Sequence, residues 1–142
     1  MKNKNIYIIA STFYEELISN LIQGALDSMP NDNNLTIIKV PGAFEIPGMI
    51  KQVIDNHNPD LIVTLGVLIK GETAHFEYIS NSISNSISQL TIASTIPIIF
   101  GVITAFNYEQ AIERAHLDKK NKGAEAMLTG LKMLDIYDKY KK

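Results

Sequence analysis

The 142-residue sequence contains no cysteine, which excludes disulfide bonds, catalysis by a thiolate and metal sites built from cysteine. Histidine is also scarce. The three histidines are His57, His75 and His116, and their spacing does not match a metal-binding motif. We therefore expect no metal ion, and the absence of cysteine makes a reducing cytoplasm the simplest expected location.

An excess of one charge and long apolar runs are lacking as well. The 13 basic and 15 acidic residues leave a formal net charge of -2, so no nucleic-acid-binding surface is expected. No apolar run approaches the roughly 18 residues of a membrane-spanning helix. The first residues, MKNKNIYIIAS, imitate a signal peptide, but Glu15 and Glu16 follow too soon, and we interpret this segment as a strand.

The length and the 46% of hydrophobic residues predict one domain, residues 1–142, with a hydrophobic core. Short apolar segments alternate with segments of helical periodicity. This alternation predicts an α/β fold with a parallel sheet and helices on both faces. The four expected strands are Asn5–Ala10, Leu35–Val40, Leu61–Ile69 and Ile96–Ile103.

Five helices are expected between and after these strands. Thr12 and Glu15 form a candidate capping box for the first helix, which should end near Met29. The others are expected from the Pro41–Gly42 turn to about Asn56, from Thr73 or Ala74 through Leu90, from Tyr108 to His116, and from Lys122 to Tyr140. Ligands of parallel sheets bind at the carboxyl ends of strands. The candidate binding loops are therefore Ser11–Tyr14, Pro41–Ile46, Lys70–His75 and Thr104–Asn107.

The segment LGVLIKGETAHFEY, residues 65–78, is the most informative part of the chain. An apolar strand breaks at Gly71, and a helix is expected to start directly afterwards, where free backbone N–H groups can bind an anion. His75 is expected in the first turn of this helix, and an imidazole can accept and release protons near neutral pH. The combination suggests chemistry on a phosphorylated small molecule.

Further motifs follow the same order along the chain: VPGAFEIP at residues 40–47, PIIFGVIT at 97–104, and EQAIERA with NKGAEA within 109–126. With these motifs the sequence resembles the lumazine synthase family. The resemblance implies a flavodoxin-like three-layer α/β/α sandwich with a four-stranded parallel sheet. It also implies a transferase of riboflavin biosynthesis that joins 5-amino-6-(D-ribitylamino)uracil to 3,4-dihydroxy-2-butanone 4-phosphate without a metal or organic cofactor.

The resemblance also implies partners. Besides the two small-molecule substrates, it implies a homo-oligomer, a pentamer or a multiple of pentamers, with active sites between neighbouring subunits. Riboflavin synthase is a further candidate partner, whereas neither nucleic acid nor a membrane is expected. The sequence leaves open whether the assembly is a pentamer, a decamer or a hollow shell of pentamers.

The family resemblance assigns the proton transfers to His75 and the phosphate to the loop Gly71, Glu72 and Thr73. Backbone N–H groups at a helix start, together with a threonine hydroxyl, can hold a phosphate group. From the residues alone, a surface histidine and a plain turn are the alternatives. Glu72 departs from the small residue usual in the family, and Lys70 replaces a more usual arginine and loses its planar fork.

Arg114 matches the arginine that grips the phosphate in the family, where a guanidinium can bind it through two hydrogen bonds. The alternative is an ordinary surface ion pair with Glu113 or Asp118. Phe13 matches an aromatic residue that stacks on the pyrimidine ring, with a core position as the alternative. Tyr14 departs from a common asparagine, which puts one polar contact with the substrate in doubt.

The remaining assignments concern the other parts of the substrates. The substrate-binding set implied by the resemblance is Phe13, Ala43, Phe44, Glu45, Val67, Ile69, Phe100 and Lys122. Glu45 is expected to bind ribityl hydroxyls, although a carboxylate there also suits a helix N-terminus. Phe100, expected at a strand end, and Lys122 resemble residues that an adjacent subunit contributes; core packing and a solvated helix start are their alternatives.

Three other functions compete with that of the enzyme. A relative that binds a lumazine or flavin without chemistry is the main alternative. The GAFE turn and the placement of His75 argue against an archaeal-type riboflavin synthase. A response regulator needs an acidic pair after the first strand and an aspartate after the third. The chain has Ala10–Ser11 and Lys70–Gly71 there, which excludes that function.

Overall fold

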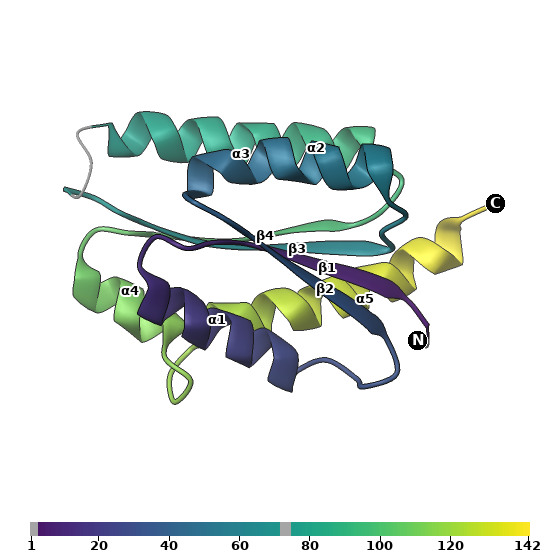
Figure 1. Ribbon diagram of the computed structural model, residues 1–142, viewed down its shortest axis with the longest axis horizontal. Coiled ribbons are helices and arrows are strands. Elements are labelled where there is room, and N and C mark those ends of the chain that lie inside the picture. Colours follow the sequence, from purple (N-terminus) through teal and green to yellow (C-terminus); the bar gives the residue numbers. More distant parts are fainter. Residues whose placement is uncertain (1–2, 72–74) are drawn as a thin grey trace.

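The computed structural model describes residues 3–71 and 75–142, and a parallel sheet lies between two layers of helices (Figure 1). The four strands are β1 (Asn5–Ser11), β2 (Asn34–Val40), β3 (Leu61–Ile69) and β4 (Ile98–Ala105). They lie in the order β2-β1-β3-β4, and each neighbouring pair is parallel. The predicted α/β/α sandwich with a four-stranded parallel sheet is therefore confirmed.

The helices divide between the two faces of the sheet. One face is covered by α1 (Glu15–Asp27), α4 (Tyr108–Ala115) and α5 (Lys122–Tyr140), and the other by α2 (Ile46–Asn56) and α3 (Phe76–Ala93) (Figure 1). A short 3-10 helix, η1 (Ala43–Glu45), precedes α2. Among the helices within the described ranges, none is long and apolar enough to cross a membrane.

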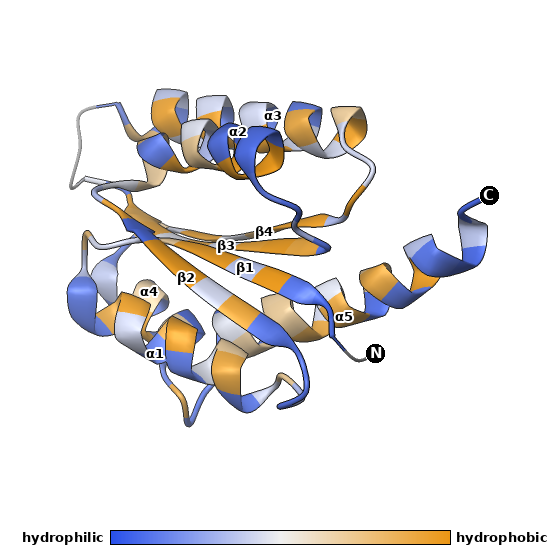
Figure 2. Ribbon diagram, turned by 45° about the vertical axis from the view of Figure 1, so that its right-hand side comes forward, coloured by the Kyte–Doolittle hydropathy of each residue, from blue (hydrophilic) through white to orange (hydrophobic). Residues whose placement is uncertain are grey.

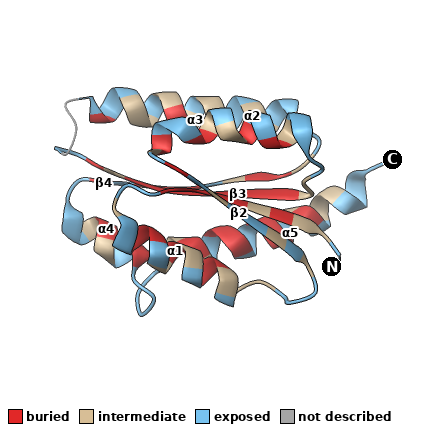
Figure 3. Ribbon diagram, in the orientation of Figure 1, coloured by how far each residue is buried: buried red, intermediate tan, exposed pale blue. Residues whose placement is uncertain are grey.

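Each face of the sheet has its own hydrophobic core. Successive strand residues point to opposite faces, so Ile8 packs in the core beside α1 and α5, whereas Ile9 packs in the core beside α2 and α3. Figures 2 and 3 show apolar and buried residues concentrated on the strands and on the helix sides that face them. The apolar residues of α3 recur at helical spacing, and two of them, Ile83 and Ile87, pack in the core beside α2 and α3.

The predicted capping box at the start of α1 is wrong. Tyr14 occupies the N-cap position with left-handed backbone angles (φ 64°, ψ 59°), and no side chain caps the helix. The N–H of Thr12 instead donates to the carbonyl of Val40 (2.8 Å), and its hydroxyl donates to the carbonyl of Pro41 (3.4 Å). The interactions of Thr12 with the chain after β2 override the local capping motif.

The element ends differ from the prediction by a few residues, as element boundaries commonly do. The first helix ends at Asp27 rather than near Met29, and α4 ends at Ala115, one residue earlier than expected. β4 begins at Ile98 because the N–H of Ile96 donates to the hydroxyl of Ser94 (3.1 Å) and proline at the next position has no N–H. The helix start expected at Thr73 or Ala74 lies outside the described residues.

Candidate active site

Five of the predicted substrate-binding residues line one surface cavity of about 200 Å³, which we call the aromatic cavity. It lies where the β1–α1 turn, the β2–η1 turn and the end of β3 meet. Its lining includes the predicted residues Phe13, Ala43, Phe44, Val67 and Ile69, together with Tyr14, Gly42, Leu68 and Ile79. Turns after β1 and β2, the last residues of β3 and Ile79 of α3 thus build this cavity together.

Two phenylalanines at this cavity are unusually exposed. Phe13 has 62% of its surface exposed and Phe44 has 56%, which contradicts the alternative of a core position for Phe13. The ring of Phe13 packs edge-on against Tyr14, with centroids 4.7 Å apart and planes at 83°. Exposed rings beside an apolar wall can stack on a flat heterocycle.

His75 lies at the edge of the aromatic cavity. It lines an adjoining hollow of about 470 Å³ with Phe44, Tyr78 and Ile79, and both Phe44 and Ile79 also line the aromatic cavity. The prediction that His75 lies in the first turn of the helix is off by one position, because α3 begins at Phe76 and His75 is its N-cap. Its carbonyl accepts the hydrogen bond of the Ile79 N–H (2.9 Å).

The predicted phosphate loop is described only at its first residue. Gly71 has a φ of +90°, a conformation that favours glycine, so the break after β3 is built into the sequence. Glu72 and Thr73 lie outside the described residues, and the predicted phosphate site at this loop stays a prediction.

Lys70 and Glu77 connect the two sides of this loop. The ammonium of Lys70 lies 3.2 Å from Glu77 Oε1 and 5.7 Å from the ring centre of Phe106. A hydrogen bond from the backbone of Glu77 itself, and then the contact with Lys70, lower the pKa of the Glu77 carboxyl. Lys70 is therefore engaged by a neighbouring carboxylate on the first turn of α3.

Glu45 lies beside the aromatic cavity, at the end of η1 and the start of α2. Its carboxylate lies against Gly42, where a methyl group in place of the glycine hydrogen would come within 3.0 Å of Glu45 Oε1. The side chain is exposed. This position suits both the predicted contact with hydroxyl groups and the favourable charge at a helix N-terminus.

Three other predicted side chains, those of Phe100, Arg114 and Lys122, line a different cavity of about 390 Å³, which we call the cationic cavity. Its lining residues are Phe100, Val102, Ile103, Thr104, Arg114, Lys120, Lys122 and Glu125. Among the described residues, the aromatic and cationic cavities have no lining residue in common. The predicted side chains Phe13, Ala43, Phe44, Val67 and Ile69 thus lie at one cavity, and Phe100, Arg114 and Lys122 at another.

Phe100 is not at a strand end, as the sequence analysis expected. It is the third residue of β4, which forms one edge of the sheet, and it has 37% of its surface exposed. Lys122 is the first residue of α5, and its ammonium lies 3.2 Å from Glu125 Oε1. Neither residue belongs to the hydrophobic cores.

Arg114 is available to an anion. Glu113, one of its expected partners, lies 4.0 Å from the ammonium of Lys119 instead. Within residues 3–71 and 75–142, neither a hydrogen bond nor an ion pair engages the guanidinium of Arg114. The alternative of a surface ion pair is therefore contradicted, and an unpaired guanidinium at a cavity is suited to a phosphate group.

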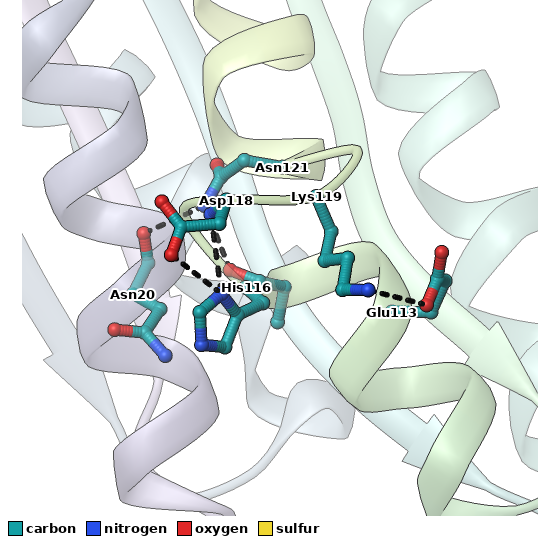
Figure 4. A network of polar contacts seen from close by, with 7 residues as sticks. Asn20, Glu113, His116, Asp118, Lys119 and Asn121 are labelled. Atoms are coloured by element: carbon teal, nitrogen blue, oxygen red, sulfur yellow. Dashed lines mark hydrogen bonds and ion pairs between the residues drawn. The ribbon is translucent and has the colours of Figure 1, made fainter.

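The loop between α4 and α5 is held by Asn121, which the sequence analysis missed (Figure 4). This side chain is only 8% exposed, and its amide donates to the carbonyls of Asn20 (2.9 Å) and Ala115 (2.7 Å). Its oxygen accepts the N–H of Ala124 (2.8 Å) and caps α5. An asparagine directly before a helix is the sequence signal for such a cap.

A further cavity of about 330 Å³ lies at the opposite ends of β3 and β4, beside residues 57–60 and 93–96. It contains none of the predicted site residues. In the described part of the chain, no group of three His, Cys, Asp or Glu side chains is arranged to hold a metal ion.

The sequence of the chain matches a known family of enzymes along nearly its whole length. The sequence model of 6,7-dimethyl-8-ribityllumazine synthase matches residues 3–138. The chain belongs to the lumazine synthase family. A 6,7-dimethyl-8-ribityllumazine synthase of Leuconostoc mesenteroides subsp. mesenteroides is 41% identical over 143 aligned residues, which cover 98% of this chain and 92% of the relative. The lumazine synthases are enzymes of riboflavin biosynthesis, so the resemblance seen in the sequence motifs is confirmed at the level of family and enzymatic function.

Proposed function

We propose that the protein catalyses formation of 6,7-dimethyl-8-ribityllumazine from 5-amino-6-(D-ribitylamino)uracil and 3,4-dihydroxy-2-butanone 4-phosphate, with release of phosphate and water. The observation that carries the proposal is the separation of the predicted side chains into an aromatic cavity beside His75 and a cationic cavity around Arg114. The two substrates have matching chemistry, because one is a flat heterocycle and the other carries a phosphate group.

The pyrimidine binds in the aromatic cavity. Its ring stacks on exposed Phe13, while Val67 and Ile69 form an apolar wall and Ala43 and Phe44 border the entrance. The ribityl chain extends toward Glu45, whose carboxylate accepts hydrogen bonds from hydroxyl groups. This orientation leaves the reacting amine near the hollow that His75 lines.

His75 transfers protons during the reaction. The amine forms a Schiff base with the ketone and expels water, phosphate is then eliminated, and ring closure expels a second water. Each of these steps moves protons, which a positioned imidazole accepts and returns. The phosphate of the second substrate is held by Arg114 and the Gly71–Thr73 loop, and Lys122 and Phe100 complete the wall. The chemistry requires neither a metal nor an organic cofactor.

The active site forms between two subunits. The aromatic and cationic cavities have no lining residue in common within the described residues, which supports a site in which the aromatic cavity of one copy faces the cationic cavity of the next. Such contacts join two different surfaces and close into a ring when the rotation fits. We therefore include Arg114, with Phe100 and Lys122, among the residues that the adjacent subunit contributes.

The assembly is a homopentamer or a multiple of pentamers in the cytoplasm, and riboflavin synthase is its candidate partner. Family membership and the two separate cavities support the ring. Sedimentation of the purified protein tests it: a pentamer or a multiple is expected, and a stable monomer would contradict the shared site.

The function is tested by following lumazine formation by absorbance from the two purified substrates. A control without protein is essential because these reactants condense unaided. We expect a rate far above that background. A folded, oligomeric sample that does not accelerate the reaction, yet binds a lumazine or flavin, would instead identify a binding protein without synthase activity.

A further inference from the structure

Two adjacent lysines in the α4–α5 loop have different surroundings. The ammonium of Lys119 lies 4.0 Å from Glu113 Oε2 and points to the α4 side of the loop (Figure 4). Lys120 takes part in neither an ion pair nor a hydrogen bond of its side chain within the described residues, and it lines the cationic cavity. No sequence motif assigns a role to Lys120.

Lys120 and Arg114 lie on the same part of the protein surface. Both residues line the cationic cavity, and both also line an adjoining hollow of about 430 Å³ beside the start of α4. The side chains of Arg114 and Lys120 therefore border the same two hollows. A ligand atom held by the guanidinium of Arg114 is therefore close to the region that the Lys120 ammonium can reach.

The charges of the cationic cavity leave two cations unpaired. Its charged lining residues are Arg114, Lys120, Lys122 and Glu125. Lys122 and Glu125 pair with each other at 3.2 Å, so Arg114 and Lys120 remain. A phosphate monoester carries a charge of roughly -1.5 to -2 at neutral pH, which two cations balance.

The backbone on both sides of Lys120 is fixed. The N–H of Lys119 donates to the carbonyl of His116 (3.1 Å), and the N–H of Asn121 donates to the carbonyl of Lys119 (3.0 Å). Asn121 is in turn anchored through its buried side chain to α1, α4 and α5. Lys120 thus extends from a fixed point, and only its side chain has to be ordered by a ligand.

We propose that Lys120 is a second phosphate-binding residue that acts beside Arg114 on the phosphorylated substrate. This inference rests on the proposed function for the identity of the substrate. Arg114 supplies directed hydrogen bonds, whereas the flexible ammonium of Lys120 supplies a point charge. Lys119, which is already paired with Glu113, has no such role.

The test compares Lys120→Gln with the matched control Lys119→Gln. For Lys120→Gln we expect KM for the phosphorylated substrate to rise about three- to tenfold, with the difference shrinking at high salt because an exposed charge is screened. For Lys119→Gln, KM for the phosphorylated substrate should stay within about twofold of the value for the unaltered protein. Lys120→Arg should restore most of the affinity, and KM for the pyrimidine should change in none of the variants.

Titration with inorganic phosphate separates this inference from the proposed function. Weaker phosphate binding in Lys120→Gln than in Lys119→Gln would support the inference even in a protein without synthase activity. Equal phosphate affinity in the two variants, or equal KM values in an active enzyme, would overturn it. Altered assembly of Lys120→Gln would overturn it too, because the ammonium would then belong to a subunit contact. Absence of lumazine formation by the unaltered protein would contradict the proposed function alone.

Discussion

The aromatic and cationic cavities of one subunit differ in nearly every physical property. The aromatic cavity has apolar strand residues and two exposed phenylalanine rings, and it lies beside the start of α3. The cationic cavity lies at the sheet edge formed by β4 and contains three cations and a single carboxylate. Under the proposed function, the aromatic cavity would recognise a flat ring and the cationic cavity a charged group.

The largest expected effect concerns the proton transfers at the aromatic cavity. His75→Ala should lower kcat by about 10²- to 10⁴-fold, because the imidazole proposed to move protons at the reacting atoms would be lost. Steady-state rates above the uncatalysed background measure the effect, and sedimentation checks the assembly. An assembled variant with unchanged kcat would remove His75 from the mechanism.

Removal of the main cation should affect only one substrate. Arg114→Ala should raise KM for the phosphorylated substrate by about ten- to hundredfold, since hydrogen bonds between charged groups are lost. KM for the pyrimidine should be nearly unchanged, which is the sharpest test of the division between the cavities. An unchanged KM of the Arg114→Ala variant for the phosphorylated substrate would disprove the assignment of Arg114.

The buried side chain of Asn121, which anchors the α4–α5 loop beside the cationic cavity, should contribute to the stability of the protein. Asn121→Ser keeps an oxygen that can cap α5 but removes the amide group that donates to the carbonyls of Asn20 and Ala115, which should cost about 2 kcal/mol of unfolding free energy. Asn107→Ser is the control, because Asn107 caps α4 on the surface through its bond with the Gln110 N–H and should lose less than ~0.5 kcal/mol.

Urea unfolding at equal subunit concentrations measures both asparagine variants, since assembly contributes to the apparent stability. Equal losses of unfolding free energy in the two variants would mean that the buried amide of Asn121 contributes no stability beyond the capping of α5.

Removal of a ring from the aromatic cavity should change KM for the pyrimidine, whereas removal of a cation from the cationic cavity should change KM for the phosphorylated substrate. Phe13→Ala should raise KM for the pyrimidine about fivefold, because the stacking contact is worth roughly 1 kcal/mol, and should leave KM for the phosphorylated substrate unchanged. Tyr140→Ala, which removes an 83% exposed ring at the end of α5, is the matched control. A shift in both KM values would show that the cavities do not act separately.

The smallest effect concerns the ion pair beside the phosphate loop. The pKa of Glu77 is lowered in the folded protein, first by its own backbone and then by Lys70, so its contribution to stability is present above the ordinary value of 4.5 and is lost as the pH falls through the lowered value. Lys70→Ala should raise the pKa of Glu77 part of the way back. Titration of the Glu77 carboxyl by NMR measures the change, and an unaltered midpoint would mean that Lys70 contributes nothing.

The sequence predicted the sheet well because β3 and its neighbours carry continuous apolar runs that only a sheet covered on both faces can bury. It failed at Thr12, where contacts with Val40 and Pro41 decide the local structure. The separation of Arg114 from His75 could not be seen either, since family motifs give order along the chain and not position in space. Asn121 was missed because one of its partners, Asn20, lies 101 residues away.

The packing around Asn121 has a consequence for how the sequence can drift. A methyl group on Gly24 would lie 2.0 Å from Asn121 Oδ1, and one on Gly123 would lie 1.9 Å from the carbonyl oxygen of Leu21. Any side chain at Gly24 therefore becomes acceptable only after Asn121 has been replaced by a smaller residue. Positions 24 and 121 therefore depend on each other during evolution. A side chain at position 24 is tolerated only if a smaller residue has already replaced Asn121, so the order of the two substitutions matters.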